Sequence, residues 1–214
     1  MSTFYFLFFF MATRLTLAAV VAAAALAVFV VLAHEVHAGE TLRWDAATFH
    51  YFQARQQVPA HALMTAVSFL ASGWAIGGIS IGCMLAFWFS PELRSRAVSL
   101  FLAAAGGQGG VYALKAFFHR ARPEAAFASL GYSFPSGHAF AAVTIYGMLA
   151  YWLTGETSSG RCWALWGGAV ALILLIGFSR VYLGVHYASD VAAGFASGVP
   201  WLWGCLSLSN SRRR

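Results

Sequence analysis

The stretch from Ser179 to Asp190 gathers side chains that can carry out acid–base or nucleophilic chemistry. It holds Arg180, His186 and Asp190 in a chain of which only 9% of the residues are charged. Positions 186 and 190 are four apart, so on a helix their side chains share one face. A carboxylate there can hold the Nδ1 proton of the imidazole and aim Nε2 outward, as in a histidine that acts as nucleophile or base. Taken alone, the pair also fits an interfacial loop with a salt bridge.

A second cluster, Pro135-Ser136-Gly137-His138, directly precedes an apolar run. We expect a helix to begin there, where free backbone N–H groups and the helix dipole favour an anion. Gly137 would let the backbone come close to such a ligand, and His138 adds a group that can exchange a proton. A turn with a capping serine would produce the same pattern.

A third cluster contains Lys115 and Arg122-Pro123. Arginine binds phosphate oxygens through a rigid fork, and lysine binds them as a point charge. The simpler interpretation of Lys115 is a membrane anchor whose ammonium group reaches the interface. His119 and Arg120, which lie between the two cations, are interpreted as interfacial residues.

The composition is that of a membrane protein. Hydrophobic residues make up 60% of the 214 residues, and the mean hydropathy is +0.70, whereas soluble domains are about 45–50% apolar and about 25% charged. The net charge is +6, but the basic residues form no continuous stripe, which argues against nucleic-acid binding. The three cysteines lie in separate apolar runs, so neither disulfides nor a zinc site is expected.

Six apolar runs predict an all-α integral membrane bundle of six transmembrane helices, forming a single domain over residues 1–214. The runs cover residues 15–33, 63–89, 97–114, 139–153, 162–178 and 191–208. The first exceeds the core of a signal peptide, so we expect it to be a retained span. In the third run, Gly106 and Gly110 have GxxxG spacing, which predicts close helix packing. Residues 34–61 mix charges with aromatics, as is typical of a segment at the membrane surface, and residues 40–61 are a candidate roof over a site.

The arginines set the expected orientation. With six spans, both chain ends lie on the side of Arg94, Arg96 and Arg161, and an excess of positive charge marks the cytoplasmic side. The basic tail at residues 212–214 adds to that excess. The three polar clusters then meet at the opposite, outer face of a cytoplasmic membrane. Together they predict an anion site with acid–base groups.

The three clusters, in this order and spacing, resemble the signature of the type 2 phosphatidic acid phosphatase (PAP2) superfamily, in its membrane lipid phosphatase branch. The resemblance implies that His186 attacks phosphorus to form a phosphohistidine and that Asp190 orients it. It implies that His138 protonates the leaving oxygen and then helps to activate water. The residues implied to bind the phosphoryl oxygens are Lys115, Arg122, Ser136, Gly137 and Arg180.

The resemblance implies a metal-independent hydrolase that needs no cofactor. A two-metal site would require several carboxylates, and only Glu124 and Asp190 lie near these clusters in the sequence. The implied substrates are lipid phosphates in the bilayer, namely phosphatidic acid, phosphatidylglycerol phosphate or undecaprenyl diphosphate. An outward-facing site favours the last of these. Two alternatives stay open: a lipid phosphotransferase with the same pocket, and a transporter or flippase, although no repeat relates the two halves of the chain.

Overall fold

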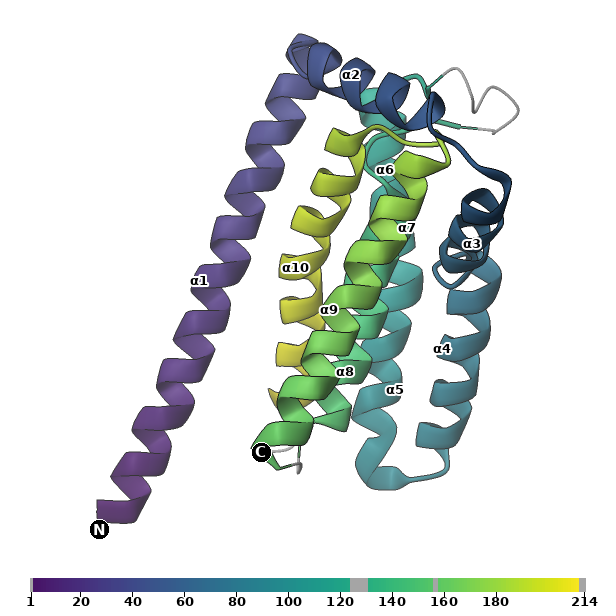
Figure 1. The fold of residues 1–214 in the computed structure, drawn as a ribbon. Helices are drawn as coiled ribbons and strands as arrows, with labels where there is room; N and C mark the ends of the chain where they lie inside the picture. Colours follow the sequence, from purple (N-terminus) through teal and green to yellow (C-terminus); the bar gives the residue numbers. More distant parts are fainter. Residues whose placement is uncertain (1, 124–130, 156–157, 212–214) are drawn as a thin grey trace.

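The computed structural model describes residues 2–123, 131–155 and 158–211. Glu124 and the basic tail at residues 212–214, both used above, lie outside the described residues. Within these ranges the chain forms helices joined by turns and contains no strand, which confirms the all-α prediction. The long helices run side by side, and both chain ends lie at the same end of the bundle (Figure 1).

The first helix lies along one side of the bundle, and the second lies across the end opposite the two chain ends (Figure 1). Helix α1 spans Ser2–Ala38 and contacts α10, and Gly39, with a φ of 77°, turns the chain into α2, Leu42–Gln53. Helix α2 lies across the end of the bundle and packs against α9 and α10 (Figure 1). The segment that the sequence identified as interfacial therefore covers one end of the bundle.

A capped break divides the second apolar run. Helix α3, Val58–Phe69, ends shortly before α4, Gly73–Trp88. The Ser72 side chain caps α4 by accepting a hydrogen bond from the Ala75 N–H at 3.2 Å. The Tyr146 hydroxyl donates to the Leu70 carbonyl at 2.8 Å, which satisfies a backbone group that the break leaves free.

The third run contains a π-helical turn, and its close packing lies at Gly106, as expected, and at Gly107 rather than Gly110. After a 3-10 turn, Pro91–Leu93, it comprises α5, η2 and α6, which cover Arg94–Phe101, Leu102–Gly106 and Gly107–Phe118. A Cβ on Gly106 would lie 3.2 Å from the Trp201 ring, and one on Gly107 would lie 2.6 Å from the Phe140 ring. The prediction for Gly110 is wrong, because that residue is exposed and its Cβ would meet nothing within 4 Å.

The fourth run forms a helical stretch at the centre of the bundle. It comprises α7, Gly137–Ala141, the π-helical turn η4, Ala142–Tyr146, and α8, Gly147–Leu153. Nearly every side chain from Ala139 to Ala150 is buried or half-buried. Because protein rather than lipid surrounds this stretch, it can be shorter than the helices around it.

The last two helices flank the loop that carries His186. Helix α9 covers Ser159–Tyr182 and α10 covers Ala188–Ser211. Among the described residues, five helical segments are long and apolar enough to cross a membrane, not six as expected, because the central stretch is too short. These segments are Thr16–Ala38, Val58–Trp88, Arg94–Phe118, Ser159–Tyr182 and Ala188–Ser209. The three cysteines are free, as expected, and Cys205 is buried.

Candidate active site

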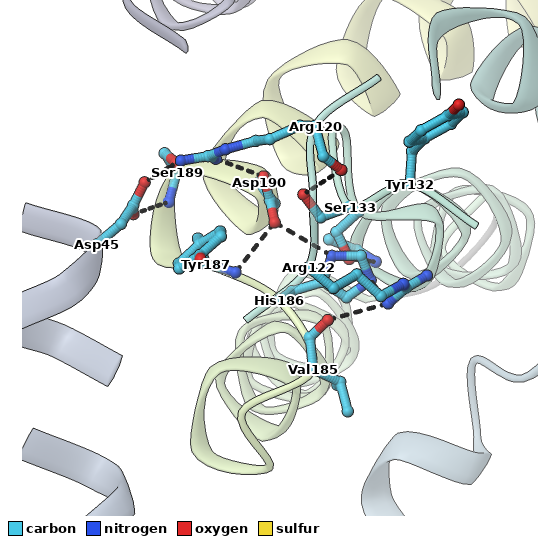
Figure 2. Close-up of polar contacts among 12 residues, drawn as sticks. Asp45, Arg120, Arg122, Tyr132, Ser133, Val185, His186, Tyr187, Ser189 and Asp190 are labelled. Atoms are coloured by element: carbon cyan, nitrogen blue, oxygen red, sulfur yellow. Dashed lines mark hydrogen bonds and ion pairs between the residues drawn. The ribbon is translucent and has the colours of Figure 1, made fainter. Parts of the chain in front are cut away.

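His186 lies in the short loop between α9 and α10, with Asp190 behind it. The Nδ1 atom of His186 is 3.3 Å from Oδ2 of Asp190, and the backbone N–H of Tyr187 donates to the same oxygen at 3.0 Å (Figure 2). The backbone N–H of His186 donates to the Arg180 carbonyl at 3.3 Å, and Gly184 turns the chain with a φ of 67°. The sequence predicted the pairing but placed it on a helix face. In the structure α10 begins after His186, at Ala188.

Arg122 faces the other nitrogen of the same imidazole. Its Nη1 donates to the Val185 carbonyl at 2.9 Å and lies 3.4 Å from Nε2 of His186, and its Nε donates to Gly131 at 3.1 Å. A guanidinium group only donates hydrogen bonds and a carboxylate only accepts them. The two contacts therefore favour the tautomer with a lone pair on Nε2 and the proton on Nδ1, toward Asp190.

Burial keeps the imidazole of His186 neutral. It lowers the pKa of His186 from 6.5 to about 4, against the hydrogen bond and charge of Asp190, which raise it. The pKa of Arg122 is also lowered by burial. Near neutral pH, a buried neutral imidazole whose Nε2 carries a lone pair can act as a nucleophile.

Ser136 caps α7 and is held from behind by α10. Its Oγ accepts a long hydrogen bond, 3.5 Å, from the Ala139 N–H, and its own N–H donates to the Asp190 carbonyl at 2.9 Å. A Cβ on Gly194 of α10 would lie 2.5 Å from the Ser136 carbonyl oxygen, so a glycine is needed for this close approach. Ser136 is fully buried.

Two further cations lie beside the histidines. Lys115 Nζ donates to the Tyr132 carbonyl at 2.5 Å and to the Ser133 carbonyl at 3.2 Å. Arg180 donates through Nη1 to the Ser68 hydroxyl, and its buried Nε has no hydrogen-bond partner among the described residues. A buried guanidinium with an unused donor fits a site for an anion.

A cavity of about 760 Å³ brings most of the sequence-derived candidates together. The candidates among its lining residues are Lys115, Arg122, Gly137, His138, Arg180 and His186. Ser136 and Asp190 lie behind this lining. The cavity continues as an apolar space along α4 and the helices from α5 to α6, past residues such as Ile76, Met84 and Phe101. A polar end joined to a long apolar end fits an amphiphile.

The charge around His138 lowers its proton affinity. Burial, followed by the positive charge of Arg180 and of the other basic groups, lowers the pKa of His138 from 6.5 to about 3. A bound phosphate dianion would counter those charges and favour the protonated form. Protonation of His138 would therefore be coupled to occupation of the cavity by an anion.

Arg120 is a site residue that the sequence interpretation missed. It was expected to be interfacial, but its side chain is only 9% exposed and forms ion pairs of 2.6 Å with both Asp45 and Asp190 (Figure 2). Although burial opposes its charge, Asp190 and Asp45 raise the pKa of Arg120 above its ordinary value. A signal was present in the sequence, because Asp45 and Asp190 are the only aspartates in the chain.

The fold defines a multi-pass integral membrane protein, and the polar clusters line one cavity whose chemistry fits an anion. Residues 96–214 match the PAP2 superfamily. The chain is 38% identical over 94 residues to phosphatidylglycerophosphatase B of Bacillus subtilis, and this alignment covers 40% of the chain and 44% of that protein. It is 30% identical over 189 residues to an Arabidopsis thaliana protein named "Probable lipid phosphate phosphatase beta", covering 75% of the chain and 86% of that protein.

A solved structure has the same fold. The crystal structure of a transmembrane PAP2 type phosphatidylglycerolphosphate phosphatase from Bacillus subtilis aligns with a TM-score of 0.81 at 24% identity, covering 90% of this chain and 98% of that one. The chain belongs to the PAP2 superfamily. The alignment with phosphatidylglycerophosphatase B spans less than half of that protein's length.

Proposed function

We propose that this protein is a lipid phosphatase that hydrolyses a lipid monophosphate or diphosphate through a phosphohistidine. The observation that carries the proposal is the joint lining of one cavity by two histidines and three cations, continued by an apolar space. Family membership and the name of the Bacillus subtilis relative support the reaction class.

In the proposed first step, Nε2 of His186 attacks phosphorus, and the bond between phosphorus and the leaving oxygen breaks. His138 gives its proton to that oxygen. Asp190 accepts the Nδ1 hydrogen bond and stabilises the positive charge of the modified imidazole. Lys115, Arg122, Arg180 and the backbone of Ser136 and Gly137 stabilise the charge on the phosphoryl oxygens.

In the second step, a water molecule loses a proton to His138 and attacks phosphorus. The P–N bond breaks, which releases phosphate and returns His186 to its neutral form. A lipid monophosphate thus yields the lipid alcohol, and a lipid diphosphate yields the lipid monophosphate. No step uses a metal ion or cofactor. Phosphatidic acid, phosphatidylglycerol phosphate and undecaprenyl diphosphate are the candidate substrates.

We also propose that the central stretch, residues 139–153, is a sixth crossing of a cytoplasmic membrane and that the cavity opens on its outer side. Helices α5 and α9 begin at the end of the bundle that carries both chain ends (Figure 1), and their first turns contain Arg94, Arg96 and Arg161. An excess of positive charge is typical of a cytoplasmic side. On the opposite side, the basic residues of the site bind partners within the protein, so they report little about orientation. An alkaline phosphatase fusion that is inactive after residue 131 and active at the C-terminus would reverse this topology.

The reaction is tested by phosphate release from the candidate lipids with purified protein in detergent and EDTA. We expect activity to persist with EDTA, His186→Ala to lower it by at least about 10³-fold, and the exposed His61→Ala control to retain it. Acid-labile ³²P on the wild-type protein would report the phosphohistidine. Dependence on a divalent ion, or full activity of His186→Ala, would contradict the mechanism. Suppression of phosphate release by an acceptor lipid would instead indicate a phosphotransferase.

A further inference from the structure

Asp45, on the surface helix α2, is tied to the candidate nucleophile through two buried ion pairs. Its Oδ2 lies 2.6 Å from Nη2 of Arg120, whose Nη1 lies 2.6 Å from Oδ1 of Asp190. The other carboxylate oxygen of Asp190 faces Nδ1 of His186. The Asp45 and Asp190 side chains are 2% and 0% exposed. The result is a continuous chain of contacts from α2 to His186 (Figure 2).

Asp45 also holds the beginning of α10. It accepts hydrogen bonds from the backbone N–H of Ser189 at 3.0 Å and from the Ser189 hydroxyl at 2.5 Å. The Arg120 guanidinium donates to the same hydroxyl at 2.7 Å and stacks over the Tyr187 ring, 4.5 Å from its centroid. The Asp45 carboxylate is favourably placed at the N-terminus of α10. Because Arg120 contacts both carboxylates, the Ser189 hydroxyl and the Tyr187 ring, it has little freedom to move relative to Asp190.

The balance of charge along this chain matters for the imidazole. Arg120 alone would neutralise Asp190 and leave little negative charge to stabilise a positively charged His186. Because Asp45 occupies the other half of the guanidinium fork, the three groups together keep one net negative charge beside the imidazole. The pairing also fixes which oxygen of Asp190 faces Nδ1, since Arg120 occupies Oδ1.

We propose that Asp45 and Arg120 are positioning residues for His186, which act by fixing the Asp190 carboxylate and setting its charge. This inference rests on the proposed nucleophilic role of His186. The charged and titratable groups that face His186 or Asp190 are Lys115, Arg120, Arg122, His138 and Arg180, with Asp45 behind Arg120. Only Asp45 and Arg120 in this set lie outside the proposed phosphate-binding and proton-transfer groups.

Removing a negative charge at Asp45 and a positive charge at Arg120 should shift the proton affinity of His186 in opposite directions. Asp45→Asn removes a negative charge, so the proton affinity of His186 should fall and the acid limb of the kcat/KM profile should move to lower pH. Arg120→Met removes a positive charge, so the same limb should move to higher pH. Each shift should be about 0.5–1 pH unit. The kcat should fall about 10–100-fold while KM changes little, because the phosphate-binding groups remain.

A third variant separates charge from geometry. Arg120→Lys keeps the charge, but one ammonium cannot reproduce a fork that binds two carboxylates, so kcat should fall while the acid limb stays in place. Matched controls on the same surface are Glu40→Gln and Arg43→Met, whose parent side chains are exposed. These should match the wild type in kcat and in the position of the limb.

The experiment combines kinetics on dioleoyl phosphatidic acid with ¹⁵N-histidine NMR titration of the full-length protein in detergent, with His186 assigned by His186→Gln. Opposite shifts in the two variants, in either readout, support the proposal. Shifts in the same direction, or none, overturn it. A wild-type protein that hydrolyses no lipid phosphate would refute the proposed function, and the NMR titration would still test the positioning role. If Arg120→Met does not fold, the near-isosteric Asp45→Asn still tests the direction of the shift.

Discussion

The Nη1 atom of Arg122 lies 3.4 Å from Nε2 of His186, on the side of the imidazole opposite Asp190. A phosphoryl group bound by Arg122 would therefore lie next to the nitrogen that carries the lone pair. Asp190, held by Arg120, occupies the other nitrogen. In the proposed mechanism, each side of one imidazole would serve a different task, with Arg122 near Nε2 and Arg120 behind the Asp190 carboxylate at Nδ1.

Arg122→Lys tests this arrangement. Lysine has one ammonium group in place of a fork that reaches Val185, Gly131 and the imidazole together. We expect kcat/KM for a lipid phosphate to fall about 10–100-fold, equivalent to about 1.4–2.7 kcal/mol. The exposed Arg43→Lys is the matched control and should leave phosphate release unchanged. Equal activities of Arg122→Lys and the wild type would remove Arg122 from the site.

Binding of an anion should be accompanied by proton uptake. His138 has a pKa of about 3 without a ligand, because of burial and of the surrounding positive charges. A dianion in the cavity offsets those charges and raises that pKa. Calorimetric titration with tungstate near pH 6, in buffers of different ionisation enthalpy, should therefore detect proton uptake that His138→Gln abolishes. Unchanged uptake in His138→Gln would assign the proton to another group.

Gly137→Ala should separate folding from anion binding. A Cβ at this position would lie 3.5 Å from Val111 and 3.6 Å from the Gln108 side chain, which are ordinary contacts. The variant should therefore melt within a few degrees of the wild type but should hydrolyse lipid phosphates at least about 10-fold more slowly, because the methyl group would occupy the ligand's space. A fully active variant would mean that no ligand approaches the backbone there.

Gly107→Ala and Gly110→Ala form a matched pair for helix packing. A methyl group on Gly107 would collide with Phe140 and crowd Trp201, whereas one on Gly110 would meet no neighbour. Overpacking costs about 1–3 kcal/mol, so Gly107→Ala should melt at lower temperature. Gly110→Ala should melt at or slightly above the wild-type temperature, since alanine favours the helix. Thermal unfolding in detergent measures both, and the reverse ranking would contradict the packing.

Acid should destabilise the fold in a defined window. His186 and His138 have pKa values of about 4 and 3 in the folded protein, below the ordinary 6.5. Below pH 6.5 the unfolded chain thus binds more protons, and stability falls as the pH falls from about 6.5 toward 4. His138→Gln should flatten the dependence of melting temperature on pH in this window, whereas His61→Gln should not. Parallel curves for His138→Gln and the wild type would show that His138 titrates normally.

The sequence predicted the helical fold and six of the residues that line the cavity because both follow from local patterns. These six are Lys115, Arg122, Gly137, His138, Arg180 and His186. Apolar runs locate the membrane helices. Because few charged or small residues lie at the ends of these runs, the candidate site residues are easy to identify. The central stretch was harder to classify, since the same apolar residues suit a lipid-facing helix and one surrounded by protein. The break before Gly73 depends on a serine cap and on Tyr146 from a distant segment, which no local pattern shows.

The link through Arg120 could not be predicted from spacing. Asp45 and Arg120 are 75 residues apart, and their contact depends on α2 lying across the end of the bundle. The rarity of aspartate in this chain was an available signal, but it does not identify a partner. Pairing between side chains of distant segments depends on the tertiary fold. A motif, in contrast, is recognised from the order and spacing of its own residues in the sequence.

The apolar continuation of the cavity has a consequence for catalysis at a membrane. Moving a lipid chain into water costs about 0.8 kcal/mol for each methylene group, or roughly 12 kcal/mol for a chain of fifteen. In the proposed binding mode, a cavity that runs along α4 and α6 would let the chain remain among apolar side chains while its phosphate reaches the histidines. The relevant substrate concentration is then the mole fraction of the lipid in the bilayer, so dilution with inert lipid should slow turnover at constant bulk concentration.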